Sequence, residues 1–225
     1  MSFDLALRAT EVLLALAILQ HSAEHLVAPM AERRLFIPRM ALAVLVLAGV
    51  GAWAVWALWL WGLVILRRFD GPYNGGSDKM TLLVLTCVAL VYLAPTPRWQ
   101  EMALAYLAVQ LTLSYFVSGW IKVINPTWRS GEALCDVFRY SAYPVSRNLR
   151  GFANWPGLLF VASWAVMGLE LVFPLTLLHP NALIVGLALC ALFHISNACF
   201  FGLNRFVWAW ISAFPSLIWF QDRIL

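Results

Sequence analysis

The chain consists of long apolar runs joined by short polar connections. A helix needs about 20 apolar residues to cross a bilayer, fewer if the bilayer thins around it. Runs of roughly this kind occupy residues 5–28, from near Pro38 to the LRRFDG segment, 79–94, 99–124, 156–178, 181–202 and 205–221. The pattern therefore predicts an all-α fold: a polytopic transmembrane helical bundle of about six or seven spans.

The connections refine this picture. The polar stretch from Asn125 to Asn154 is predicted to hold a short interfacial helix around Gly131–Tyr140. The LHPN connection is so short that the spans on either side of it should form a helical hairpin. The FGLNRF link is either a sharp turn or a break within one bent helix. The segment RFDGPYNGGSDKM is rich in turn residues, which favours loop structure over a cation site or a helix cap.

Composition agrees with a membrane protein. Hydrophobic residues make up 63% of the 225 residues, charged residues make up 12%, and the mean hydropathy is +0.81. A soluble domain could not bury so much apolar surface, so we expect one integral membrane domain over residues 1–225. The net charge of +4 fits topology signals and anionic headgroups, which indicates membrane lipids and not nucleic acid as partners.

Charge also orients the chain. Seven spans would place the N-terminus, the 125–154 segment and Arg205 together on the side with more Lys and Arg, which the positive-inside rule makes cytoplasmic. No CxxC or CxxH spacing occurs, so neither a disulfide framework nor a zinc site is predicted. The first apolar run has no cleavage site and is expected to be a retained span.

Lys122 lies close to the end of the fourth run, in the segment YFVSGWIKVINPTW. Tyr115 and Ser118 precede it by seven and four residues and so share its helix face, while Gly119 allows close approach of a helix or a ligand. A buried lysine can lose its proton and act as a base, because burial disfavours the charged form. A lysine at this depth can equally reach the headgroups and serve as an anchor.

Two further polar residues interrupt later runs. Glu170 falls in the middle of the fifth run, where a carboxylate is costly unless it is paired, protonated or in contact with water; Lys122 and Arg205 are its candidate partners. His194 falls in the sixth run and shares a helix face with Asn197. These two residues either form a hydrogen bond across helices, or contact a ligand, or take part in proton transfer.

Two other patterns favour structure over chemistry. HSAEH, His21 to His25, matches the H-x-x-E-H pattern of inverted zinc proteases, but no third ligand can be identified and the pattern sits at a span end. No metal site is therefore predicted, and haem ligation together with His194 has no stronger support. The tryptophans of the Trp53–Trp61 cluster recur at helical spacing, which indicates packing or lipid contact.

Taken in order, the segments YFVSGWIKVINPTW with the following GEAL, then GLELVFPL, then HISNACFFGLNRF resemble the HTTM membrane domain, which includes the vitamin-K-dependent gamma-glutamyl carboxylases. The resemblance covers roughly residues 103–220. It implies an HTTM-like topology and a cofactor cavity for a quinone or other lipid-soluble ligand. It gives Lys122 the role of the base that deprotonates the reduced quinone, and it makes Glu170 and His194 lining residues.

Two departures limit what the resemblance implies. The carboxylases have adjacent lysines at this element, whereas Ile121 precedes Lys122 here. They also have a large lumenal domain, and the chain as given ends at Leu225 without one. We therefore do not expect a glutamate-carboxylating enzyme, and the family implies the fold more firmly than a reaction.

Two classes of function remain open. The first is quinone-linked redox or base chemistry in a bacterial inner membrane, with Lys122, Glu170 and His194 as catalytic residues. In this hypothesis Tyr115, Ser118, Gly119 and Asn197 hold the cofactor. The second is a non-catalytic accessory subunit that docks on other membrane-protein subunits through the Trp53–Trp61 cluster and binds lipid, quinone or pigment at the contact. A third possibility is an assembly or immunity factor for a secreted peptide.

Overall fold

All the secondary structure of the protein is helical in the computed structural model, which describes residues 1–27, 30–69, 75–141 and 145–225. Within these ranges eleven α-helices and three short 3₁₀ segments occur and no strand is found. The all-α prediction is therefore confirmed. The helices form two compact units, called here unit 1 (residues 1–109 and 208–225) and unit 2 (residues 110–207).

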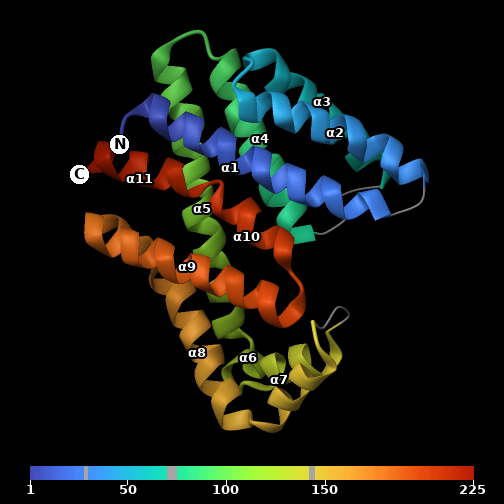
Figure 1. Cartoon of the computed structure of the whole chain (residues 1–225). Coiled ribbons are helices and arrows are strands. Elements are labelled where there is room, and N and C mark those ends of the chain that lie inside the picture. The colour runs from blue at the N-terminus through green and yellow to red at the C-terminus, as the bar shows by residue number, and fades with distance from the viewer. Residues whose placement is uncertain (28–29, 70–74, 142–144) are drawn as a thin grey trace. The chain divides into compact units, whose positions relative to one another are not determined.

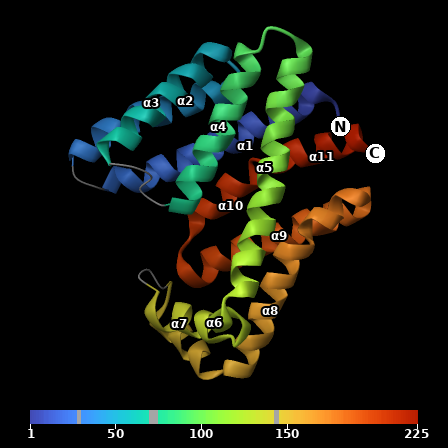
Figure 2. The same cartoon turned by 180° about the vertical axis from the view of Figure 1, so that it is seen from behind.

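Unit 1 is formed by the N-terminal helices and the C-terminal helix (Figure 1). Its elements are α1 (Phe3–Glu24), η1 (His25–Val27), α2 (Met30–Ala48), α3 (Ala52–Arg68), α4 (Gly75–Leu93), the first half of α5 (Pro97–Ile124), the second half of α10 (Asn204–Ile211) and α11 (Phe214–Ile224). Helix α1 packs against α2, α4 and α11, and α3 contacts both α2 and α4. Figure 2 shows these helices from behind.

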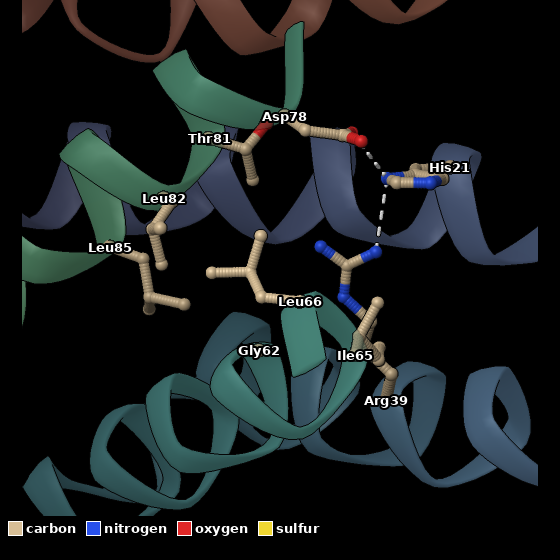
Figure 3. A pocket seen from close by; sticks show the side chains of 9 residues that line it. All are labelled: His21, Arg39, Gly62, Ile65, Leu66, Asp78, Thr81, Leu82 and Leu85. Carbon is tan, nitrogen blue, oxygen red and sulfur yellow. Dashed lines mark hydrogen bonds and ion pairs between the residues drawn. The ribbon is translucent and has the colours of Figure 1, made fainter. Parts of the chain in front are cut away.

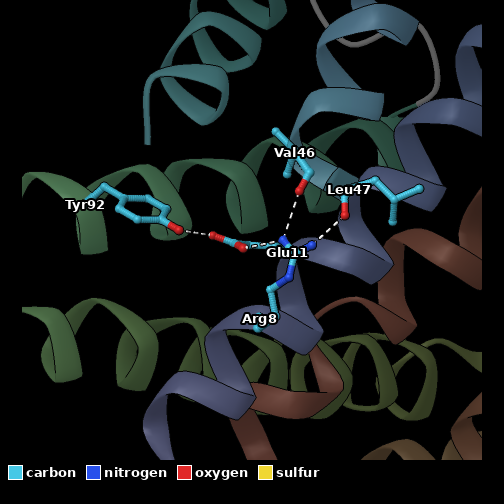
Figure 4. A network of polar contacts seen from close by, with 5 residues as sticks. All are labelled: Arg8, Glu11, Val46, Leu47 and Tyr92. Carbon is cyan, nitrogen blue, oxygen red and sulfur yellow. Dashed lines mark hydrogen bonds and ion pairs between the residues drawn. The ribbon is translucent and has the colours of Figure 1, made fainter. Parts of the chain in front are cut away.

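A polar network holds three helices of unit 1 together (Figure 4). Arg8 donates to the carbonyls of Val46 and Leu47 at 2.9 and 2.5 Å, and it pairs with Glu11 at 2.9 Å. Tyr92 of α4 donates to the same glutamate. Arg8 therefore caps the C-terminal end of α2: it donates to the Leu47 carbonyl and adds a second donor to the Val46 carbonyl, which also accepts from the Gly49 N–H at 3.0 Å.

The expectation of one span from Pro38 to the LRRFDG segment is wrong. The structure has two helices there, α2 and α3, because the chain turns at Gly49 and Gly51, whose φ angles are 72° and 119°. Residues that carry a side chain rarely adopt such backbone angles, so glycines at these positions permit the turn. The expected last span is also divided, into α10 and α11.

Unit 2 contains the second half of α5 and the elements after it. They are α6 (Pro126–Arg129), α7 (Glu132–Tyr140), η2 (Arg147–Asn154), α8 (Pro156–Val172), η3 (Phe173–Leu178) and α9 (Pro180–Phe201). Helices α6 and α7 contact α8, and α7 also packs on η2. A short helix is confirmed where an interfacial one was predicted: it is α7, whose apolar face carries Cys135 and Phe138 into a small core with Leu159 and Phe201.

The connections of unit 2 settle two questions left open by the sequence. Helix α8 continues into η3 and turns at His179 into α9, which gives the predicted hairpin. The FGLNRF link is a turn, because α9 ends at Gly202, whose φ of 68° closes the helix, and α10 begins at Asn204. In the RFDGPYNGGSDKM segment, Asp70 and Asn74 lie outside the described residues, and Asp78 lies in the first turn of α4.

Four described segments are long and apolar enough to cross a membrane. They are Gly76–Leu93, Pro97–Ile124, Pro156–Leu178 and Pro180–Phe201. These segments correspond to the third, fourth, fifth and sixth spans expected from the sequence. Of the other expected spans, the first coincides with α1, which carries Arg8 and Glu11 within it. The structure therefore supports a membrane-embedded helical bundle with four candidate spans among the described residues.

Candidate functional site

An ion pair between α5 and α8 forms the centre of the candidate site. Lys122 Nζ lies 2.6 Å from Oε2 and 2.7 Å from Oε1 of Glu170. The Glu170 side chain is 4% exposed and that of Lys122 is 15% exposed. Of the two partners suggested by the sequence for Glu170, the structure therefore selects Lys122. The amine is held by protein and does not extend freely to the headgroups.

Ser118 completes a triangle with these two residues. Its Oγ accepts a hydrogen bond from Lys122 Nζ at 2.7 Å and donates one to Glu170 Oε1 at 3.1 Å. Lysine and serine lie four residues apart on α5, which places them on one helix face. The ammonium therefore uses its donors on three acceptor atoms, and this satisfaction lets a charge pair persist in an apolar unit.

Gly119 brings the two helices close enough for this contact. A Cβ at this position would lie 2.8 Å from the Leu171 amide nitrogen and 2.9 Å from Glu170 Cβ, which is closer than real Cβ atoms approach. The backbones of α5 and α8 therefore meet where only glycine fits, one turn from Lys122. The sequence suggested that Gly119 admits a helix or a ligand, and the structure shows a helix there.

The short helix α6 closes one side of the site. Trp128 places its ring centroid 5.4 Å from Lys122 Nζ, a cation–π contact. Helix α6 is fixed to α8 by two hydrogen bonds, from Ser163 to the Trp128 carbonyl at 2.7 Å and from Trp164 to the Arg129 carbonyl at 3.1 Å. The tryptophan is therefore held in place by α8, the helix that also carries Glu170.

Two adjoining cavities open beside the ion pair, and we call them together the unit 2 groove. The first, of about 630 Å³, includes polar side chains at its wall: Lys122, Trp128, Asp136, Tyr140, Ser141 and Asn197. The second, of about 480 Å³, is lined almost entirely by apolar residues of α7, η2, α8 and α9. The cavities share five lining residues: Leu134, Val166, Phe193, Asn197 and Phe201. The groove thus has a polar end at Lys122 and an apolar end rich in phenylalanine.

Tyr115 and His194 form a separate contact deeper in unit 2. Tyr115 Oη lies 3.0 Å from His194 Nε2, and the tyrosine and the histidine are 1% and 2% exposed. The Tyr115 ring also packs against Phe173, with centroids 4.5 Å apart. The sequence suggested His194 as a catalytic residue alongside Lys122. In the structure the Nε2 atom of His194 lies beside the Tyr115 hydroxyl.

The predicted site residues therefore fall into two sets. Lys122 and Asn197 line the groove. Glu170 and Ser118 do not line it, but both accept hydrogen bonds from the Lys122 amine. Tyr115, Gly119 and His194 are buried in helix packing. Sequence reasoning missed that α7 forms a wall of the groove. Its strongly one-sided apolar pattern was the available signal, but it indicates only a buried face and not what that face encloses.

The HSAEH histidines have other partners. His21 Nδ1 lies 3.0 Å from Arg39 Nη1, and His25 Nδ1 lies 2.9 Å from Glu32 Oε2. His25 also stacks on Phe36 with ring centroids 3.8 Å apart. In the described part of the chain, no group of three or more His, Cys, Asp or Glu residues could hold a metal ion.

Long apolar helices together with a buried charge pair define this chain as an integral membrane protein of the helical-bundle class. Residues 89–222, more than half of the chain, match the family model of the HTTM domain, and the chain belongs to this family. The match contains α5, α8, α9 and the whole unit 2 groove. No curated protein and no solved structure matches the chain.

Proposed function

We propose that the unit 2 groove binds one amphiphilic, lipid-soluble molecule of the quinone class. Its oxygen-bearing ring would lie at the Lys122 end, and its apolar tail would lie among the phenylalanines of the other end. The observation that carries the proposal is a groove with one buried ammonium at a polar end and a continuous apolar wall beyond it. Small-molecule sites commonly combine apolar walls with a few polar groups that fix orientation.

The residues at the polar end suit a ring with oxygen substituents. The Trp128 ring offers a flat face for stacking, and Lys122 and Asn197 offer N–H donors to a carbonyl or phenolate oxygen. At the other end, Phe138, Phe152 and Phe200 provide aromatic surface without charge. A ligand with a polar head and a hydrocarbon tail matches both ends at once.

The ion pair gives the proposed site a way to handle a proton. A quinol oxygen beside Lys122 would give its proton to the Lys122 amine as the ammonium passes one of its own protons to the Glu170 carboxylate, so that Lys122 stays charged and Glu170 becomes neutral. The ammonium would then stabilise the oxyanion left on the ring, as preorganised donors do at other sites of developing charge. Ser118 would keep both groups oriented during the transfer.

Quinone binding can be measured through tryptophan fluorescence. The full chain in lipid nanodiscs would be titrated with a decyl-substituted benzoquinone, and we expect saturable quenching. Lys122→Met should weaken binding about 10- to 100-fold, because a hydrogen bond to a charged group contributes about 1.5–3 kcal/mol. Trp128→Phe should remove part of the saturable signal.

The matched control is Lys79→Met, because Lys79 is the other lysine of the chain and lies exposed on α4 in unit 1. It should leave the titration unchanged. Quenching that rises linearly without saturation, or equal affinity in the Lys122→Met and Lys79→Met variants, would show that the probe only dissolves in the bilayer.

A second candidate, the accessory subunit, is favoured by one feature of α3. Trp53, Leu60 and Val64 lie on one face of this helix and are 54%, 56% and 46% exposed. Trp59 and Trp61 instead donate hydrogen bonds within unit 1, to Thr86 and to the Leu35 carbonyl. We infer that the exposed face of α3 contacts either lipid or a partner subunit. Photo-crosslinking from position 53 in native membranes distinguishes them, since only a partner gives a discrete protein adduct.

A further inference from the structure

Unit 1 contains a second cluster of ionisable side chains, outside the segment that matches the HTTM family. His21 of α1, Arg39 of α2 and Asp78 of α4 converge beside a cavity of about 40 Å³ (Figure 3). His21 and Arg39 are 5% and 7% exposed. The remaining walls come from α3 and α4 and are almost entirely apolar. Ionisable groups in such surroundings are costly, which makes a functional role the first hypothesis.

The contacts of the cluster meet at one atom. His21 Nδ1 lies 3.0 Å from Arg39 Nη1 and 3.5 Å from Asp78 Oδ1. A guanidinium can only donate, so Nδ1 must accept that hydrogen bond through its lone pair. This assigns His21 to the neutral form with its proton on Nε2. The nearby carboxylate can only accept, so it cannot hydrogen-bond to Nδ1 in that state.

The same lone pair is where a further proton would add. Once protonated, Nδ1 could donate to Asp78 but could no longer accept from Arg39, and two positive groups would face each other. We propose that His21 Nδ1 is a proton-binding site at which Arg39 and Asp78 compete, so that proton uptake exchanges the α1–α2 contact for an α1–α4 contact. This site is independent of the ligand proposed for the unit 2 groove.

The cavity makes this exchange physically reasonable. A space of about 40 Å³ exceeds the roughly 10–15 Å³ that one water needs, and the guanidinium borders it. Water there can accept the Arg39 N–H that the protonated His21 ring no longer accepts, so the arginine does not lose a hydrogen bond when the ring is protonated. Leu66 and Leu85 on the opposite wall keep the rest of the cavity apolar (Figure 3).

Among the described residues, the other groups packed near His21 do not supply the same competition. His25 lies one turn away with its ring centroid at 5.2 Å, and its Nδ1 is 2.9 Å from Glu32 Oε2, a carboxylate that only accepts. Phe36 of α2 packs at 5.5 Å and carries no charge. The residues of α3 at the cavity are Gly62, Ile65 and Leu66. Arg39 and Asp78 are therefore the opposed pair, and His25 provides an internal comparison.

The test is histidine nitrogen NMR on the full chain in nanodiscs between pH 8 and pH 5, the range in which histidine commonly titrates. The chain has four histidines, and a His21→Gln sample assigns the signal. At pH 8 we expect the Nε2–H form, and at lower pH the doubly protonated ring. Asp78→Asn should lower the midpoint pH by about one unit or more, because it removes the nearby negative charge.

Arg39→Gln should move the midpoint in the opposite direction, because it removes both the competing donor and a like charge. Glu32→Gln is the matched control, because Glu32 contacts His25 and not His21, and it should leave the His21 midpoint in place. Opposite shifts support the proposal, since they require that Arg39 and Asp78 both act on the proton of His21. The proposal would be overturned by a His21 ring that keeps one protonation state from pH 8 to pH 5, or by an unchanged His21 midpoint in Asp78→Asn. If Arg39→Gln does not fold, the result for Asp78→Asn decides alone.

Discussion

Removing one member of the Lys122–Glu170 pair should destabilise unit 2 far more than removing both. Lys122→Met would leave the Glu170 carboxylate, whose side chain is 4% exposed, with the Ser118 hydroxyl as its remaining hydrogen-bond donor among the described residues. Glu170→Met would leave an ammonium facing an apolar helix. Replacing both by methionine removes the uncompensated charge and retains much of the side-chain volume.

The expected cost of each single substitution is about 3 kcal/mol. Breaking a buried ion pair costs about 3–5 kcal/mol in soluble proteins, and the lower end applies because chains unfolded within a membrane also find polar partners. This corresponds to roughly a hundredfold in the unfolding constant. The double variant should recover most of the loss, because apolar replacement of a buried pair is often neutral or stabilising.

The free energy of unfolding would be measured for the wild type, the two single variants and the double variant by reversible denaturation in detergent micelles, as a double-mutant cycle. Unit 2 can be followed selectively by a fluorophore placed on Cys199, the exposed cysteine of α9. Additive effects of the two substitutions, or single variants as stable as the wild type, would refute the interpretation. Such results would mean that water or lipid headgroups already solvate both charges.

Two further predictions concern backbone packing in each unit. Gly119→Ala should destabilise unit 2 by about 1–3 kcal/mol through overpacking, whereas Gly168→Ala, with nothing within 4 Å of the added Cβ, should be neutral or stabilising in the same denaturation assay. Arg8→Met should speed hydrogen exchange at the Gly49 amide, because it removes the donors that fix the last turn of α2, where the Gly49 N–H bonds to the Val46 carbonyl. The control is Arg98→Met, since Arg98 is exposed. Equal exchange rates in the two variants would contradict the capping role.

The position of the site could be predicted from sequence more completely than its geometry. Helical spacing placed Ser118 and Lys122 on one face, and the cost of a mid-membrane carboxylate marked Glu170. The sequence could not decide whether Glu170 pairs with Lys122 or with Arg205, because that depends on where α5 crosses α8. That crossing is set by a backbone contact at Gly119, and a glycine in an apolar helix indicates close packing without naming the neighbour.

Other features were hidden for different physical reasons. The break between α2 and α3 lies in an apolar stretch, so hydropathy alone continues across Gly49 and Gly51. The network of Arg8, Glu11 and Tyr92 joins residues up to 81 positions apart, and local periodicity carries no information about such pairs. The groove is formed by packing α7 and η2 on α8 and α9, and it exists only in three dimensions.

The two ionisable sites differ in a way that decides what each can do. At Lys122 the opposite charges contact each other directly at 2.6 Å, so the pair is neutral and any proton must come from a molecule in the groove. At His21 a neutral ring stands between Arg39 and Asp78 and can itself bind a proton from solvent. The first site therefore requires a ligand to act, and it lies within residues 89–222, which carry the HTTM domain. The second requires only a change in pH and lies before that segment, so substitutions at Asp78 should alter the pH response without altering ligand binding.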